Sequence, residues 1–502
     1  MMKREILINV EFQETRVAIL NKGVLEEFYI ERADETRLVG NIYKGRIKTI
    51  LLGIAGAFVD IGINKNGFLL TSEKISPLVL EDEPHVLETE IFIPSKKPQI
   101  KTKVVDSLKP GQELTVQVVK EPYGIKGPRL TTNITLPGRY LVLMPRQMHF
   151  GISRRIENEQ ERTRLKKVLE SLSIPTGMGL IVRTAGSGKE RKEFQRDLNY
   201  LLNLWKRINR LAGFKSAPFL LHQEYDIILR NIRDTFTEDV DKLFIDSKEQ
   251  FKRILHFVNI LCPHLKRNIS YYTGDEDLFE KFNIDTEIEK LYRTRVGLRS
   301  GGYIVIEQTE GLVAIDVNSG KFVGKKSLED TVFNVNMEAA NEIARQIKLR
   351  DLGGIIIIDF IDMEKESHRN RVYQTFLEAL KLDKARSNVL PVSEIGLIQM
   401  TRQRTRRSIE SKMYDSCSYC KGRGSIKSAL TMSILAIRNL KKMLKDLHRR
   451  SNVSIYVHPD VAWKLLNEQR SAISYLEDRY KSKIIINEDP KKHIEDIEIK
   501  VA

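Results

Sequence analysis

The chain has 502 residues, and 83 Lys and Arg against 67 Asp and Glu give it a formal net charge of +16. This length exceeds what one hydrophobic core supports, so we expect three or more domains. The charge favours an anionic partner, above all a nucleic acid, with a basic but inert surface as the alternative. Three cysteines exclude a disulfide framework. The sequence shows no signal peptide and no apolar run long enough for a membrane span, so we expect a cytoplasmic protein.

The N-terminal third of the sequence is predicted to form strands. EILINVEF, TRVAIL and LEEFYIE alternate apolar and polar side chains, and Asn21-Lys22-Gly23 predicts a turn. After residue 36, short β-rich runs separated by glycines are typical of a small OB-type barrel. Phe58 and Phe68 are candidate stacking platforms for nucleic-acid bases, although core positions would suit either of them equally well. Residues 80–110 are rich in Pro, Lys and Glu, and we expect a long loop within or beside the barrel.

Two amphipathic helices are predicted around residues 165–172 and 194–208, with a strand and a Gly-rich turn, GLIVRTAGSGKE, between them. This segment is not a nucleotide-binding P-loop, because Arg183 stands where a Gly is required and Glu190 follows Lys189. The guanidinium of Arg183 and the hydroxyl of Thr184 suit the binding of a terminal phosphate. An ordinary surface turn is the alternative.

Residues 291–412 alternate strands and helices, which predicts an α/β layer. Two apolar strand-like runs end in aspartates, Asp316 after GLVAI and Asp359 after GGIIII, and Asn318 follows the first. Carboxylates brought together at strand ends suit a hard dication such as Mg²⁺, which activates water for attack on a phosphodiester. The alternative is that each aspartate caps the turn or helix that follows it. Ser327 and Gly353 mark the expected start and end of the helix between them.

Cys417 and Cys420 form a CxxC pair followed by glycines, which has the shape of half a zinc site. The missing ligands would come from the same pair on a second chain. A redox pair is less favoured, because no thioredoxin-like βαβ context is visible around Cys417. The preceding basic run either follows an RNA backbone or is a solvated linker; it comprises Arg402, Arg404, Arg406 and Arg407. Residues 425–502 predict a small, mostly helical unit with two strands.

Taken in order, these motifs resemble the bacterial ribonuclease E/G family over nearly the whole chain: NIYKGRI, GAFVDIG, ISRRIE, GLIVRTAG, AIDVNSG, LRDLGGIIIIDFIDM and CxxCxGxG. IDVNSGKFVG and IQMTRQRTRRSIE are more similar to the ribonuclease G branch than to the ribonuclease E branch. The resemblance implies a multidomain α/β and β fold. Its parts are an RNase H-like fold (1–36 and 229–291), an inserted OB-type barrel (37–126), a 5′-sensor domain (127–228), a DNase I-like catalytic domain (292–412), a zinc link (413–425) and a small α+β dimerisation domain (426–502). Residues 80–105 find no place in this pattern.

The resemblance further implies a Mg²⁺-dependent endoribonuclease that cleaves single-stranded RNA, prefers a 5′-monophosphate, and acts in ribosomal RNA processing and mRNA decay. Asp316 and Asp359 would hold the catalytic Mg²⁺, with Asn318 beside them, and Cys417 and Cys420 would bind a zinc ion shared in a homodimer that can pair further. The remaining roles are 5′-phosphate binding by Arg183, Thr184, Arg386, Gly138 and Val142, and RNA binding by Phe58, Phe68 and Lys126. A non-catalytic RNA-binding protein and a DNA nuclease stay open as alternatives, and Mn²⁺ can replace Mg²⁺.

Overall fold

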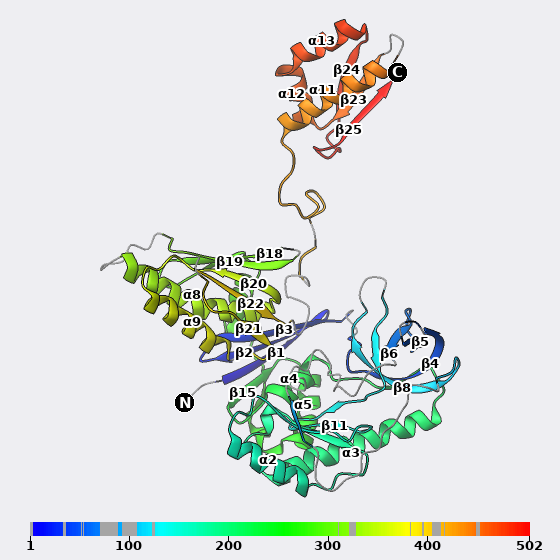
Figure 1. Ribbon diagram of the computed structural model, residues 1–502, viewed down its shortest axis with the longest axis vertical. Coiled ribbons are helices and arrows are strands. Elements are labelled where there is room, and N and C mark those ends of the chain that lie inside the picture. The colour runs from blue at the N-terminus through cyan, green and yellow to red at the C-terminus, as the bar shows by residue number, and fades with distance from the viewer. Residues whose placement is uncertain are drawn as a thin grey trace. The chain divides into compact units, whose positions relative to one another are not determined.

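The computed structural model describes residues 4–33, 37–51, 53, 55–70, 89–92, 108–122, 126–309, 311–320, 328–381, 383–393, 396–403, 413–415, 417–447 and 452–501. The chain forms two compact units, Met1–Glu410 and Ser411–Ala502. In the described residues the first unit contains four sheets and the second contains one (Figure 1). No helix among these residues is long and apolar enough to cross a membrane.

The N-terminal sheet joins two segments that are far apart in the sequence. Its strand order is β16-β15-β1-β2-β3, and β1 pairs in parallel with β15. Lys22 and Gly23 have φ angles of 52° and 77°, so they form the predicted tight turn between β2 and β3. The elements are β1 (Arg4–Val10), β2 (Glu14–Asn21), β3 (Val24–Arg32), α4 (Ile227–Thr235), β15 (Val240–Ile245), α5 (Lys248–Leu261), η4 (Pro263–Asn268), β16 (Ile269–Tyr271), α6 (Leu278–Lys281) and α7 (Ile284–Leu291).

A closed five-stranded barrel follows the N-terminal hairpins. The order β4-β5-β6-β9-β8 closes because β8 also pairs with β4, while β14 extends the sheet from β4. The predicted boundary at residue 126 is wrong, because β9 lies beyond it and completes the ring. The strands are β4 (Ile42–Leu51), β5 (Gly56–Asp60), β6 (Gly67–Leu70), β8 (Glu113–Lys120), β9 (Arg129–Thr131) and β14 (Phe219–His222).

The middle sheet has the order β10-β11-β13-β12-β7. Its edge strand β7 comes from within residues 80–110, so the expectation of a continuous loop there is wrong. The long helix α3 packs its apolar side against this sheet, with Phe194 and Leu198 fully buried. The elements are β7 (Thr89–Phe92), β10 (Leu136–Pro137), β11 (Leu141–Met144), β12 (Phe150–Ser153), α2 (Glu159–Ser171), β13 (Gly179–Val182), η3 (Thr184–Gly186) and α3 (Arg191–Phe214).

The fourth sheet, called the aspartate sheet below, has the order β17-β18-β19-β20-β22-β21. Figure 1 shows α8 and α9 together on one face of this sheet. Val313, Ile315, Ile356 and Ile358 pack with these helices in one core. The elements are β17 (Arg295–Gly297), β18 (Tyr303–Gln308), β19 (Leu312–Asn318), α8 (Leu328–Arg350), β20 (Gly354–Asp359), α9 (Glu366–Leu380), β21 (Ser387–Val389) and β22 (Leu397–Arg402).

Helix α8 ends differently from the prediction. Asp351, not Gly353, reverses the chain: its φ angle is 50°, and the N–H of Leu352 donates to the carbonyl of Ile347 at 3.0 Å, which is a Schellman-type end. An aspartate tolerates this left-handed conformation because its short polar side chain can be held locally. Here the Asp351 carboxylate accepts from Arg402 at 2.7 Å. The predicted cap residue Ser327 lies outside the described residues.

The C-terminal unit is a three-stranded sheet covered by helices, with the order β24-β23-β25. β23 and β24 run parallel and are joined through α12 and α13, which makes a βαβ unit. The sequence predicted two of its strands and missed β25, which pairs antiparallel with β23. The elements are α11 (Ala429–Asp446), β23 (Val453–Val457), α12 (Pro459–Asn467), α13 (Arg470–Tyr480), β24 (Ile484–Glu488) and β25 (Ile497–Val501).

Candidate active site

Asp316 and Asp359 lie side by side near the ends of adjacent strands. β19 and β20 are parallel, and their register pairs Asp316 directly with Asp359. Register partners point to the same side of a sheet, and adjacent strands lie about 4.8 Å apart. Because the alternate residues pack against α8 and α9, both carboxylates project from the opposite, exposed face. The convergence expected from the sequence is therefore confirmed.

The two carboxylates repel each other. Partial desolvation, followed by the negative charges of Asp316 and Asp362, raises the pKa of Asp359 above its ordinary value. Within the described part of the chain, none of these three aspartates has a Lys or Arg partner at ion-pair distance. The site therefore holds an excess of negative charge that a cation would stabilise.

Asn318 lies in the same strand as Asp316 and on the same face. Its side-chain Nδ2 donates a hydrogen bond to Oδ2 of Asp316 at 2.7 Å. This bond fixes the orientation of the Asp316 carboxylate and leaves Oδ1 without this partner. The structure thus brings together all three residues that the sequence assigned to catalysis.

The donor set fits a hard dication held mainly by water. Mg²⁺ commonly binds one or two carboxylates and keeps several waters. The described residues contain no group of three or more His, Cys, Asp or Glu side chains with metal-binding geometry. Two carboxylates with an amide beside them offer the oxygen ligands that suit Mg²⁺ or Mn²⁺.

Arg183 is held inside the middle sheet. It is only 5% exposed, and its Nη1 donates to the carbonyl of Gly138 at 2.6 Å and pairs with Asp234 at 2.7 Å. Arg183 and Arg233 both lie against Asp234, and despite desolvation they lower the pKa of this carboxylate. The alternative of an ordinary surface turn is wrong for Arg183, because its guanidinium is buried and oriented.

The backbone around Gly138 is shaped by a carboxylate that the sequence prediction missed. Asp197 of α3 is buried and accepts the N–H groups of Arg139, Tyr140 and Leu141 at 3.1, 2.8 and 2.9 Å. A Cβ at Gly138 would lie 2.6 Å from Asp197 Oδ2, so only glycine fits there. An aspartate between the apolar residues of α3 was the available signal.

The other predicted phosphate ligands differ in their exposure and in their contacts. Thr184 shares a hydrogen bond with Ser153 at 3.0 Å. Arg386 is exposed, and its segment is tied to the same region because Arg155 donates to the carbonyl of Lys384. Val142 lies inside β11, paired with Pro137 and Ile181, with a buried side chain. The structure therefore unites Arg183 with Gly138, brings the segments of Thr184 and Arg386 to this region, and places Val142 within the sheet itself.

Phe58 and Phe68 form a cross-strand pair on the barrel. They are register partners in β5 and β6, and their ring centroids lie 5.7 Å apart in an edge-to-face arrangement. Phe58 is 37% exposed. Gly56 leaves room for the Phe68 ring, since a Cβ there would lie 2.6 Å from it. The exposure of Phe58 rules out the fully buried position that the sequence left open.

Lys126 is exposed just before β9. A Cβ at the following residue, Gly127, would collide with the carbonyl oxygen of Asn66 at 1.9 Å, so the two backbones are in close contact there. β9 then pairs with β6 at Phe68. Lys126 therefore lies at the edge of the barrel that carries the two phenylalanines.

Cys417 and Cys420 lie in a tight turn of the C-terminal unit and are both free thiols. Hydrogen bonds to the Cys417 sulfur from the backbone of Cys420 and then Tyr419 lower the pKa of this thiol, which favours the thiolate that zinc binds. His493 Nε2 lies 2.7 Å from the Tyr419 carbonyl and ties the turn to the rest of the unit. Two thiols fit half of a zinc site, and the described residues offer no further ligands beside them.

The basic run before this turn divides in two. Arg402 is 4% exposed and is bound by Asp351 and Asp383, at 2.7 and 2.6 Å. It is therefore neither an RNA-tracking residue nor a solvated linker, and both expectations are wrong for it. Arg404, Arg406 and Arg407 lie outside the described residues.

Comparison with known proteins gives the chain its family. Residues 135–405 match the model of the ribonuclease E/G family, and residues 416–502 match that of the RNase E/G thioredoxin-like domain. The chain is 40% identical to ribonuclease G of Escherichia coli (strain K12) over 477 residues, which is 95% of each protein. It is 40% identical to ribonuclease G of Haemophilus influenzae over 93% of this chain and 92% of that protein. The ribonuclease E of Haemophilus influenzae is 39% identical over 97% of this chain but only 50% of its own length. The chain belongs to the ribonuclease E/G family.

The second match corrects one expectation. The sequence suggested no thioredoxin-like context near Cys417, yet the C-terminal unit contains a βαβ unit and matches a thioredoxin-like domain. Cys417 and Cys420 precede α11 and are not part of the βαβ unit itself. The expectation of no thioredoxin-like context around Cys417 was therefore wrong.

Proposed function

We propose that this endoribonuclease cleaves single-stranded RNA with a Mg²⁺ ion held between Asp316 and Asp359. The observation that carries the proposal is the register pairing of these two aspartates, without a basic partner in the described residues. Such an ion lowers the pKa of a bound water and stabilises charge on the phosphate. Asn318 keeps Asp316 oriented, and Mn²⁺ suits the same oxygen ligands.

The barrel offers the RNA-binding surface for this reaction. An exposed aromatic ring stacks on any base, and a neighbouring cation contacts the phosphate backbone, so Phe58, Phe68 and Lys126 suit a single strand. The barrel edge that carries them supports this role. Ribosomal RNA precursors and mRNA are the substrates we propose, in the cytoplasm.

A preference for 5′-monophosphorylated RNA belongs to the same proposal. We assign the 5′-phosphate to Arg183, Thr184, Arg386 and the backbone near Gly138 and Val142. A buried guanidinium whose orientation is fixed by Asp234 supports this role, because a charge-assisted hydrogen bond to phosphate is strongest from a positioned donor. Anchoring of the 5′ end would raise the rate by positioning the strand.

The C-terminal unit supports dimer formation in this proposal. Cys417 and Cys420 supply two of four zinc ligands, and a second copy supplies the others, which gives a homodimer able to pair further. On the same basis the N-terminal sheet is assigned as the RNase H-like fold, the middle sheet as the 5′ sensor and the aspartate sheet as the DNase I-like catalytic domain. Residues 413–425 and 426–502 are the zinc link and the dimerisation domain.

The test separates RNA cleavage from RNA binding. A 5′-labelled single-stranded RNA is incubated with the wild type, Asp359→Asn and the control Asp241→Asn, which alters an exposed aspartate of β15. We expect cleavage by the wild type and control only when a divalent ion is present, and loss of cleavage in Asp359→Asn with RNA affinity retained. Full cleavage by Asp359→Asn contradicts the metal site. Equal cleavage of single-stranded DNA with the same 5′ end contradicts the choice of RNA.

A further inference from the structure

Helix α3 presents an outward face whose composition is unusual. Its 24 residues bury Phe194, Leu198, Leu201, Trp205 and Ile208 on one side. At 100° per residue the opposite side carries five exposed cations, called the α3 basic stripe below: Lys192, Arg196, Lys206, Arg207 and Arg210. The stripe therefore faces away from the core along nearly the whole helix.

The acidic residues of α3 do not neutralise this face. Glu193 takes part in the capping box at the start of the helix, and Asp197 is buried against the backbone near Gly138. None of the five stripe residues has an ion pair or a side-chain hydrogen bond within the described residues. By contrast Lys189, just before the helix, pairs with Glu238 at 2.7 Å. The stripe is a row of cations without counterions in the described part of the chain.

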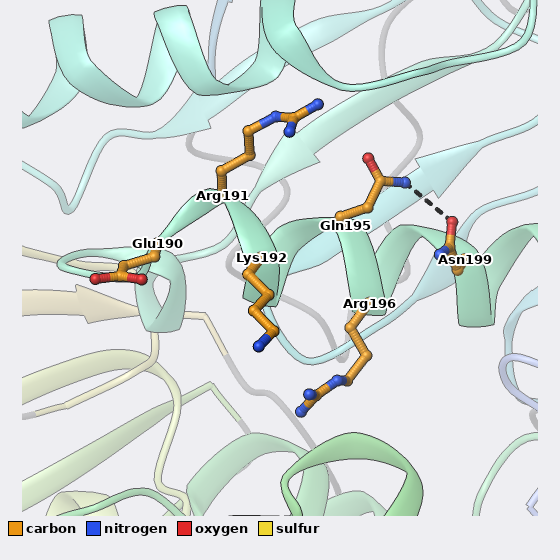
Figure 2. Close-up of a pocket in the computed structure, with 6 residues that line it drawn as sticks. All are labelled: Glu190, Arg191, Lys192, Gln195, Arg196 and Asn199. Atoms are coloured by element: carbon orange, nitrogen blue, oxygen red, sulfur yellow. Dashed lines mark hydrogen bonds between the residues drawn. The ribbon is translucent and has the colours of Figure 1, made fainter.

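Neutral polar groups and one aromatic ring extend the same face. Figure 2 shows Lys192 and Arg196 extending to the same side of α3, and Gln195 donating to Asn199 at 2.9 Å. An open hollow of about 660 Å³ adjoins these residues. Phe214, at the end of the helix, is 83% exposed. Cations, amides and an exposed ring are the groups that bind the phosphates and bases of a nucleic-acid strand.

The stripe also lies on the path between two sites already assigned. α3 begins next to the turn that follows Arg183, and β14, after its far end, pairs with β4 of the barrel. Figure 1 shows α3 running from the middle sheet towards the barrel strands. From Lys192 to Phe214 the helix rises about 33 Å at 1.5 Å per residue. This length spans roughly ten phosphates of a stacked strand at 3.4 Å each.

The geometry points to α3 as a second RNA-binding surface that contacts the phosphate backbone of RNA outside the active site. The inference rests on the proposed function, since RNA is the polyanion that the active site and barrel would accept. Charge complementarity carries it: five exposed cations lie along this face, against one carboxylate, Glu190, beside the hollow at the start of the helix. The α3 surface would add affinity for long substrates without contacting the cleaved bond.

The test replaces four of the five cations of the α3 basic stripe and measures binding. Lys192→Gln, Arg196→Gln, Arg207→Gln and Arg210→Gln are combined in the Asp359→Asn protein, because Gln keeps helix propensity and these positions are exposed. Affinity for a fluorescent 40-nucleotide single-stranded RNA and for a 10-nucleotide one is measured at several salt concentrations. Each phosphate contact contributes about −0.7 to the slope of log K against log salt, so four lost contacts should make the slope shallower by about three.

We expect the 40-nucleotide RNA to bind at least tenfold more weakly at about 0.1 M salt, with a smaller loss for the 10-nucleotide RNA. The matched control removes four exposed lysines elsewhere: Lys242→Gln, Lys248→Gln, Lys381→Gln and Lys483→Gln. A second variant, Phe214→Ser, should weaken binding by about five- to tenfold if the ring stacks on a base. Circular dichroism checks that each variant is folded.

The inference is overturned if the stripe variant keeps the wild-type affinity and salt slope, or if the lysine control loses as much. It is also overturned if the stripe variant retains RNA binding but loses binding to vesicles of anionic lipid. The proposed function fails by a different result, namely no metal-dependent cleavage of the 10-nucleotide RNA by the wild type. The two failures are therefore distinguishable.

Discussion

The aspartates at the two ends of strand β20 differ in whether they have a basic partner. At its first residue, Gly354 pairs with Arg402 of β22, and Arg402 binds both Asp351 and Asp383 in a buried cluster. At its last residue, Asp359 pairs with Asp316, and neither carboxylate has a basic partner in the described residues. One strand thus has a buried cluster held by a cation at one end and an exposed pair of carboxylates without a cation at the other.

The difference separates structural charge from charge that suits a ligand. Removing one partner of a buried ion cluster leaves charges that water cannot solvate. The intact first cluster is therefore needed for the stability of the fold. The second cluster is exposed and repulsive, so the fold gains nothing from its ionised form. A group that costs stability when ionised and lies at an open sheet face is a functional candidate on physical grounds.

The largest expected effect is on activity. Asp316→Asn should lower kcat/KM for single-stranded RNA on the order of a thousandfold, because a metal ligand worth several kcal/mol is lost. Thermal unfolding without divalent ions should hardly change, and the rise in Tm that Mg²⁺ gives the wild type should disappear. A variant that keeps its activity but loses Tm would place Asp316 with the structural charges.

At the other end of β20, a substitution of Arg402 should affect the stability of the fold. Arg402→Met should lower the free energy of unfolding by about 3–5 kcal/mol, since Asp351 and Asp383 are left buried without a cation. Urea denaturation measures the change, with Lys381→Met as an exposed control. Adding Asp351→Asn and Asp383→Asn should restore much of the loss. A stability equal to that of the control would show that the cluster is not needed for folding.

The pair of thiols resembles the Asp316 and Asp359 pair, because the described residues offer it no third metal-ligating side chain. Cys417→Ser should remove bound zinc and convert the dimer to monomer at micromolar concentration. Metal analysis and light scattering report the two effects, with Cys262→Ser, a buried cysteine elsewhere, as control. Unchanged mass and zinc content would rule out the shared site.

Arg183 resembles Arg402, because it is buried and paired with a carboxylate, yet we propose that it binds the 5′-phosphate of RNA. Arg183→Gln should narrow the rate difference between 5′-monophosphate and 5′-hydroxyl RNA by about tenfold, the value of one charge-assisted hydrogen bond. The rate on 5′-hydroxyl RNA serves as the internal control for folding. If both rates fall equally, Arg183 acts only through its ion pair with Asp234.

The smallest effect is on pH dependence. The folded-state pKa of Asp359 is raised, so ionisation favours the unfolded chain, and stability is lost as pH rises above the ordinary value of 3.8. In the absence of divalent ions, Asp359→Asn should therefore be more stable than the wild type at pH 7, and this advantage should vanish below pH 3.8. Urea titrations at both pH values measure it. An advantage that grows on acidification has the wrong sign.

The sequence located the strands of the aspartate sheet because apolar runs with a terminal aspartate carry a local signal. It also foresaw that Asp316 and Asp359 converge, since both follow strands of one α/β layer. The sequence could not predict the one-to-one register of these two aspartates, because register depends on how β19 and β20 pack against α8 and α9.

Other features depend on partners far away in the sequence. No residue near Arg183 in the sequence indicates that Asp234, 51 positions later, orients its guanidinium. Arg402 sits in a run of arginines that looks solvated, and only its contacts with Asp351 and Asp383 reveal a buried role. Strand β7 was hidden in a segment rich in Pro, Lys and Glu, because an edge strand needs only one partner, here β12.

The parallel pairing of β1 with β15 has a consequence for synthesis. The backbone N–H of Val10 donates a hydrogen bond to the carboxylate of Asp246, 236 positions further along the chain. At about 5–20 residues per second, a ribosome needs roughly 10–50 s to supply that partner. Until then the outer edge of β1 has no partner strand, while the barrel and the middle sheet can already form. An unpaired strand edge can pair with another chain, so the edge of β1 is a point of aggregation risk during translation.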